Sequence, residues 1–295
     1  MRDVDRDEES KHRSPILFLA PAFLIFVFFY AGALIMLFVQ SLQTYTPGRI
    51  VQVSQSFSFA NYIIYWGRNL VYYGFLWDSL RIGGIATVIS VLIAYPLAHK
   101  ISRTERALVK KTLLTVLVAT FFINSIVKVY SWVIMQGDAG LINEILTALG
   151  YSKVRFLGTD EAVIIGLIYF LFPIATMALI GPIKNVDSTL EQAAGNLGAT
   201  NTQVFFDVTL PLSMPGTIAA TLLCYALAVS AFIIPMFLGS GIVLMMSNII
   251  FSRYSESFNY PGGAALAMVF LATILFIAFG INRLLTKRLK GFGYG

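Results

Sequence analysis

The polar residues whose spacing is most informative interrupt the apolar second half of the chain at residues 188–216. Ser188 precedes Glu191 by three positions, the spacing at which a serine caps a helix and a glutamate bonds back to the cap. Apolar residues then recur at helical spacing up to Gly198, where a left-handed cap would end the helix. The stripe consists of Leu190, Ala193, Ala194 and Leu197. The chemistry expected of such a segment is non-covalent, because a short helix with few charges and an apolar stripe is suited to contact another protein.

A second short helix is expected directly after Gly198. Thr200 and Gln203 repeat the capping-box spacing at its start. We expect Phe205 to pack against the base of the segment rather than to contact a partner. Pro211 is expected to end this helix, because the residue before a proline is disfavoured in the helical region. Leu210 and Pro211 would then set the angle at which the following span enters the membrane.

Lys128 is the one ionised side chain that lies clearly within an apolar run. A lysine at the centre of a bilayer costs about 2.5–3.5 kcal/mol on insertion scales, so such residues tend to face a water-filled path or a partner. Lys128 also lies near the outer end of its span, where its stem would reach the interface instead. Both interpretations stay open. The candidate lining of a solute pathway consists of Asn124, Ser125, Lys128, Tyr130 and Tyr169, and interhelical hydrogen bonding is the alternative for its uncharged members.

The residue patterns of common catalytic sites are missing from the sequence. It contains no G-x-x-x-x-G-K-[ST] loop, so any ATP and Mg²⁺ would have to be bound by a separate subunit, and no cofactor is expected in this chain. The two histidines, His12 and His99, stand far apart, so no metal site is expected. The single cysteine, Cys224, lies in an apolar run and is expected to be a buried side chain. No catalytic residue is predicted, and the chain is not expected to be an enzyme.

The composition indicates a membrane protein. Hydrophobic residues make up 57% of the chain and charged residues 12%, whereas about 25% is typical of soluble domains. Apolar runs long enough to cross a bilayer predict an all-α membrane protein with six transmembrane helices. The runs lie at residues 15–39, 79–98, 112–135, 161–183, 215–238 and 263–282. The net charge of +6 is spread over the flanks of these runs, which favours a role in topology over binding of nucleic acid.

Smaller features refine the expected spans. The Ala-Gly-Ala sequence at 31–33 imitates a signal-peptide cleavage site, but the apolar run continues beyond it, so we expect a retained first span. Apolar residues at helical spacing predict a short external helix at 141–149. A kink is expected at Pro173 and an interruption of the fifth span at Pro235.

The distribution of Lys and Arg predicts the orientation. These residues are more numerous in the N-terminal tail, the 99–111 connection and the C-terminal end than in the connections on the other side. Both termini and the segment after the fourth span are therefore expected in the cytoplasm. We divide the chain into a cytoplasmic tail at 1–14, a first span with an external loop at 15–78, a transmembrane unit at 79–284 with the two-helix segment at 184–214, and a cytoplasmic C-terminus at 285–295.

The two-helix segment resembles the EAA loop of the membrane subunits of binding-protein-dependent ABC importers. That pattern is Glu-Ala-Ala, three residues, Gly, and Leu-Pro about a dozen residues later. The matching residues are Ala193, Ala194, Gly198, Leu210 and Pro211. With Gly198 aligned, the family glutamate falls on Gln192, and Glu191 lies one position earlier. The resemblance implies that the loop is a coupling helix docked on an ATPase. Either Glu191 or Gln192 would make the polar contact, and Glu191 has capping as its alternative.

Three further stretches extend the resemblance. Residues 124–130 (NSIVKVY), 141–144 (LINE) and 211–216 (PLSMPG) resemble the first permease of spermidine/putrescine-type importers. The resemblance implies a type I ABC importer permease in the cell inner membrane, with a second related permease, two ATPase subunits and an external solute-binding protein as partners. It implies a polyamine as solute, although members of this group also carry amino-acid derivatives and organophosphonates.

Two other classes of membrane protein are the alternatives to an ABC importer. A secondary transporter driven by an ion gradient would normally show buried carboxylates, or broken helices at corresponding places in two halves. Neither is evident in the sequence. A structural or receptor subunit would need no gate. ATP-dependent uptake would separate the importer from both.

Overall fold

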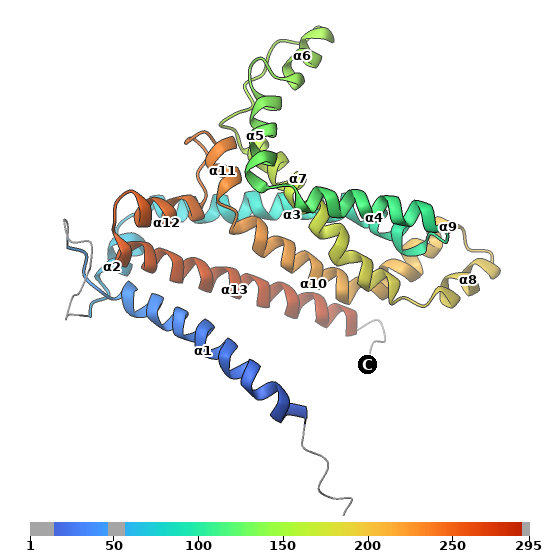
Figure 1. Ribbon diagram of the computed structural model, residues 1–295, viewed down its shortest axis with the longest axis horizontal. Helices are drawn as coiled ribbons and strands as arrows, with labels where there is room; N and C mark the ends of the chain where they lie inside the picture. Colours follow the sequence, from blue (N-terminus) through green and yellow to red (C-terminus); the bar gives the residue numbers. More distant parts are fainter. Residues whose placement is uncertain (1–14, 47–56, 291–295) are drawn as a thin grey trace, which may run out of the picture.

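The computed structural model describes residues 15–46 and 57–290. In this part of the chain the regular secondary structure is helical apart from one isolated β-bridge between Gln43 and Phe57, and irregular connections join the helices (Figure 1). Its elements in chain order are α1 Pro15–Ser41, α2 Ala60–Tyr62, the π-helix η1 Ile63–Gly67, α3 Val71–Arg103, α4 Ala107–Phe122, α5 Ser125–Gln136, α6 Leu141–Ala148, α7 Asp160–Lys184, α8 Ser188–Asn196, α9 Asn201–Val204, the π-helix η2 Phe205–Thr209, α10 Leu210–Val229, α11 Ile233–Leu238, α12 Met246–Ser255 and α13 Tyr260–Lys290.

Five helices in the described ranges are long and apolar enough to cross a membrane. They are α1, α3, α7, the continuous helix Asn201–Val229 and α13. Six crossings result if α4 and the α5–α6 segment together count as one broken span, and these two parts are bent by 92° at their junction. The expected all-α membrane fold is confirmed, and the third span expected at 112–135 is broken between Phe122 and Ser125.

The break in the third span has a local cause at Asn124. Ile123 and Asn124 both have extended backbone, with ψ of 130° and 135°. The Asn124 side chain accepts a hydrogen bond from the Ile126 backbone N–H at 2.8 Å. Asparagine at this position satisfies a donor that a helix start leaves without a partner, so a new helix begins at Ser125 in a new direction. In Figure 1, α5 departs from the direction of α4 beside α11, and α6 stands clear of the bundle.

The centre of the bundle is the packing of α3 against α7 and α10. Ile82, Leu167 and Leu179 are fully buried there, together with Cys224, whose burial was expected. Gly83 allows a close approach of α3 to α10, because a Cβ atom placed on it would lie 2.6 Å from Val229 Cγ2. Small residues at crossing points are typical of helices that pack inside membranes.

A second buried cluster joins the start of α3 and the end of α10 to α12 and α13. The rings of Tyr65 and Tyr72 meet edge to face, with centroids 5.0 Å apart. Arg253 donates to the Tyr72 hydroxyl at 2.7 Å and lies over the Tyr65 ring. In Figure 1, α1 lies beside α13, and most of the surface of α1 is not covered by another helix. That surface is apolar, which suits contact with lipid.

Two sequence expectations about prolines are wrong. Pro211 does not end the second loop helix, because the chain is helical without interruption from Asn201 to Val229. The π-helical turn Phe205–Thr209 lies just before Leu210 and Pro211. Such a wider turn accommodates the carbonyl group that would otherwise bond to the N–H that proline lacks. The fifth span is also interrupted before Pro235, at 230–232, and Pro235 lies inside α11.

Candidate functional site

The two-helix loop, residues 185–209, connects α7 to α10 at the end of the bundle opposite α12 (Figure 1). Gly198 separates α8 from α9 with φ of +92°, a left-handed conformation that glycine adopts without steric cost. The Gly198 and Ala199 backbone N–H groups bond the carbonyl oxygens of Gly195 and Ala194 at 3.0 and 3.1 Å. The expected helix–glycine–helix arrangement is confirmed.

The caps of the two loop helices agree with the sequence expectation in one case only. Thr200 and Gln203 form the expected capping box. The first helix is capped by Asp187 instead of Ser188, and the Asp187 carboxylate accepts the Thr189 backbone N–H at 2.9 Å. Hydrogen bonds from the Thr189 backbone and side chain lower the pKa of Asp187. The capping role considered for Glu191 is therefore wrong.

Glu191 instead holds the loop against α3. Its Oε1 accepts hydrogen bonds from Arg103 Nη2 at 2.8 Å, from Arg103 Nε at 3.1 Å and from Thr209 Oγ1 at 2.6 Å. The Arg103 and Glu191 side chains are 20% and 15% exposed. Arg103 Nη2 also donates to the Val186 carbonyl oxygen at 2.8 Å. The Arg103 and Glu191 side chains thus join four segments, namely α3, the connection before α8, α8 itself and η2.

The opposite face of α8 is open. Leu190 is 49% exposed and Leu197 is 90% exposed. Gln192 and Ala193 are also exposed, whereas Ala194 is half-buried. The apolar stripe found in the sequence therefore does not pack within the described part of this chain. It offers an uncovered surface at the tip of the loop.

Phe205 packs at the base of the loop, as expected. Its ring meets those of Tyr95 and His99 edge to face, at centroid distances of 5.5 and 5.4 Å. Leu210 and Pro211 follow within the continuous helix and are both half-buried. A cleft of about 610 Å³, lined by both polar and apolar side chains, lies between the loop and the end of α3. Its lining includes His99, Lys100, Arg103, Glu191, Gln192 and Asn201.

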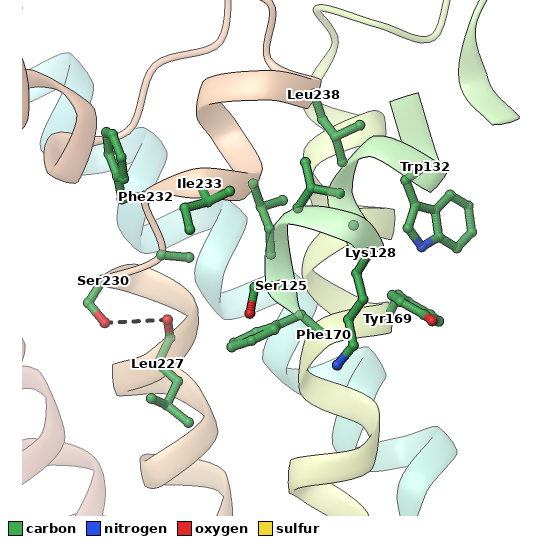
Figure 2. A pocket seen from close by; sticks show the side chains of 14 residues that line it. Ser125, Lys128, Trp132, Tyr169, Phe170, Leu227, Ser230, Phe232, Ile233 and Leu238 are labelled. Carbon is green, nitrogen blue, oxygen red and sulfur yellow. Dashed lines mark hydrogen bonds between the residues drawn. The ribbon is translucent and has the colours of Figure 1, made fainter. Parts of the chain in front are cut away.

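A second cavity, of about 310 Å³, lies beside α5 and is bordered by α7 and the break between α10 and α11. Lys128 lines it and is only 6% exposed. Figure 2 shows its side chain extending toward Tyr169 and Phe170, with the Trp132 ring close by. Trp132 and Tyr169 are in ring contact at 5.6 Å. Within the described ranges, no hydrogen bond or ion pair joins the Lys128 ammonium to another side chain.

The structure gathers three of the five candidate pathway residues in this cavity. Ser125, Lys128 and Tyr169 line it, whereas Asn124 and Tyr130 do not. The Asn124 side chain caps α5, and the Tyr130 ring contacts Phe237 at 5.0 Å. The Lys128 side chain borders this cavity, so a place in a solute pathway stays a prediction for it.

Sequence reasoning missed several residues, both at the two-helix loop and at the cavity beside Lys128. Arg103 and Thr209 lie 88 and 18 positions from Glu191, so local spacing gave no sign of their contact. Trp132 and Ser230 also line the cavity beside Lys128. Ser230, a polar residue at the end of a long apolar run, was a usable signal for the break after α10.

Comparison with known proteins gives one family. Residues 86–291 match the model of the binding-protein-dependent transport system inner membrane component. The chain is 37% identical over 227 residues to the spermidine/putrescine transport system permease protein PotB of Haemophilus influenzae, covering 75% of this chain and 79% of that protein. It is 32% identical to the PotB of Escherichia coli, covering 75% of this chain and 82% of the relative.

Solved structures agree at the level of the fold. A chain of a bacterial alginate ABC transporter, in complex with a pentasaccharide-bound periplasmic protein, aligns with a TM-score of 0.75 at 17% identity, covering 94% of this chain and 95% of that one. A chain of the MetNI methionine ABC transporter aligns with a TM-score of 0.58 at 15% identity, covering 73% of this chain and 94% of that one.

Proposed function

Because the chain belongs to the family of binding-protein-dependent transport system inner membrane components, we propose that it forms half of the solute pathway of an ATP-driven importer. The other half comes from a second, related permease. Two ATPase subunits bind ATP and Mg²⁺, and an external solute-binding protein delivers the solute. This chain is a transmembrane component without a catalytic site of its own.

The observation that carries this proposal is the uncovered apolar face of α8. Leu190 and Leu197 lie at the tip of a loop whose base is held by buried contacts at Phe205 and Glu191. A rigid base with an exposed apolar tip suits docking into a groove of a partner protein. The loop joins α7 directly to α10, so a partner that moves α8 also moves two helices of the central core. Rocking of these packed helices would then open the solute pathway to one side of the membrane and to the other in turn.

The orientation follows from the same assignment. Docking on an ATPase requires the two-helix loop in the cytoplasm, and the excess of Lys and Arg in the termini and the 99–111 connection favours the same side. The cavity beside Lys128 then lies toward the outer half of the membrane. We propose that Ser125, Lys128 and Tyr169 contribute to the solute pathway there.

A polyamine is the first candidate solute. Relatives at 37% and 32% identity are named as spermidine/putrescine permeases. The Trp132 and Tyr169 rings beside the outer cavity offer aromatic faces to an ammonium group. A polyamine would pass these faces as a weakly held cation, as transport requires.

The buried Lys128 supports a second candidate class, an amino-acid derivative or an organophosphonate. A second ammonium at 4 Å from Lys128 is repelled by about 1 kcal/mol in water and about 4 kcal/mol at an effective dielectric constant of 20. A carboxylate or phosphonate at the same place is attracted by as much. The absence of a counter-charge for Lys128 in the described ranges therefore favours a solute with an anionic group.

Uptake into proteoliposomes that contain both permeases and the ATPase subunits tests the proposal. We expect uptake of radiolabelled spermidine that requires ATP inside the vesicle and the binding protein on the other side. Unlabelled spermidine should compete, whereas an amino acid or aminophosphonate that competes better identifies the second class of solute. Uptake by this chain without an ATPase, driven by an ion gradient, would identify a secondary transporter and overturn the proposal.

A further inference from the structure

We infer that Arg103, Glu191 and Thr209 form a clamp that transmits displacement of the two-helix loop to α3. The inference rests on the proposed function, in which a partner moves the loop. It assigns to Arg103 and Thr209 a positioning role, and it places Glu191 inside the mechanical link instead of at the surface that meets the partner.

The first support is the geometry of the three side chains. Arg103 is the last residue of α3, Glu191 lies in the first turn of α8, and Thr209 is the last residue of η2, directly before α10. A single carboxylate oxygen of Glu191 accepts two N–H groups of Arg103 and the hydroxyl of Thr209, all within 3.1 Å. The three residues thus join helices that are distant in sequence.

The second support is burial. Thr209 is fully buried, and the Arg103 and Glu191 side chains retain 20% and 15% of their exposure. Exposed ion pairs contribute little, because water screens them and flexible side chains lose entropy on pairing. Charge-assisted hydrogen bonds that are shielded from water are stronger, and removal of one partner leaves the other charge without compensation. The clamp is therefore stiff enough to carry a displacement.

The third support is what the clamp adds to the covalent connections. The chain already ties the loop to α7 at one end and to α10 at the other. It has no covalent link to α3, which packs along both of these helices and crosses the whole bundle (Figure 1). The Phe205 ring of the loop packs on Tyr95 and His99 of α3, and the clamp adds charge-assisted hydrogen bonds to this apolar contact. Through Arg103 and Glu191, α8 and α3 move together. The bond from Arg103 to the Val186 carbonyl oxygen holds the chain just before α8 in the same unit.

One consequence concerns the residue that meets the partner. Glu191 has its carboxylate turned toward α3, while the next residue, Gln192, is exposed. Gln192 is therefore the polar side chain that faces outward at this point of α8. A contact of Glu191 with the ATPase would require breaking the clamp first.

The test uses the complete importer in proteoliposomes and measures solute uptake and ATP hydrolysis on the same preparation. For E191Q and R103A we expect uptake per ATP hydrolysed to fall by at least about tenfold, since each change leaves the remaining charge of the pair without its counter-charge. Hydrolysis itself and binding of the ATPase are expected to remain. The exchanged pair R103E/E191R should recover most of the lost uptake, because the ion pair is restored with opposite polarity.

Two controls make the result decisive. Asp207→Asn removes an exposed carboxylate from the same loop and should leave the uptake ratio unchanged. Thr209→Val keeps the side-chain shape and removes the hydroxyl, and it should lower the ratio less than E191Q does. It keeps the test informative if a charged variant fails to assemble.

Several outcomes would overturn the inference. An unchanged ratio of uptake to hydrolysis in E191Q, R103A and Thr209→Val would exclude transmission through these residues. Loss of ATPase binding in E191Q but not in R103A, without recovery in R103E/E191R, would show that Glu191 contacts the partner directly. If the unaltered complex takes up no solute with ATP, the proposed function fails, and this result is separate from any ranking of the variants.

Discussion

Glu191 illustrates how one side chain takes its role from distant residues. Its spacing from Ser188 predicted a cap, and its place beside the family glutamate position predicted a contact with an ATPase. The structure instead pairs it with Arg103 and Thr209. A carboxylate near a partly buried arginine and a buried hydroxyl is more stable there than at an exposed cap, where water competes for the same hydrogen bonds.

Gly198 is the residue whose backbone the loop most requires. With φ of +92° it adopts a conformation that costs other residues about 1–2 kcal/mol. Gly198→Val should therefore shift the direction of α8 against α9 and weaken ATPase binding, measured by co-purification of the ATPase. Gly195→Ala, at an α8 position where an added Cβ meets no atom within 4 Å, is the matched control and should bind normally. Normal co-purification with Gly198→Val would show that the turn is not needed for docking.

Lys128 separates the two candidate solute classes. If a polyamine passes the outer cavity, Lys128→Met removes a repulsion of about 1 kcal/mol or more and should lower the KM for spermidine by about fivefold or more. If the solute carries a carboxylate or phosphonate, the same change should nearly abolish its uptake. Initial rates of uptake at varied solute concentration distinguish the two results. An unchanged KM and rate would remove the cavity from the solute pathway.

At the scale of elements, helix–helix approach depends on Gly83. Gly83→Leu should push α3 away from α10, because even a Cβ atom would lie 2.6 Å from Val229 Cγ2. We expect the protein to lose about 1–3 kcal/mol of stability, as overpacked cores do. Thermal unfolding in detergent measures the loss. Gly84→Ala is the control, since its nearest neighbour is Tyr225 at 3.9 Å, and it should unfold at the normal temperature. Equal unfolding temperatures for both variants would contradict the packing described here.

The spans were predictable because the bilayer imposes length and composition on a helix. The break in the third span was not predictable, because an asparagine such as Asn124 within an apolar run can cap a new helix or form a hydrogen bond to a neighbouring helix. Its capping role depends on extended backbone at Ile123, which composition does not encode. The prediction that Pro211 ends a helix was wrong for a similar reason. The π-helical turn that accommodates this proline leaves no sign in the pattern of apolar residues.

Across the whole molecule, the two-helix loop and the outer cavity lie on different parts of one core. The loop is continuous with α7 and α10, and both of these helices contribute to the lining of the cavity beside Lys128. Family membership and the loop were readable from the sequence, because short local motifs carry them. The cavity lining and the clamp were not, because they unite residues from helices that only the tertiary fold brings together.

The central claim is that the apolar tip of the two-helix loop contacts an ATPase in the cytoplasm. Leu197, which is 90% exposed, is replaced by cysteine in a chain that also carries Cys224→Ser, so that the new thiol is the single one in the chain. The assembled importer is then treated with a short heterobifunctional reagent that joins this thiol to an amine of a neighbouring subunit. We predict a cross-linked product that contains this chain and the ATPase, and protection of the thiol from an impermeant reagent outside intact cells. A thiol that reacts from outside, or that never captures the ATPase, would contradict the account.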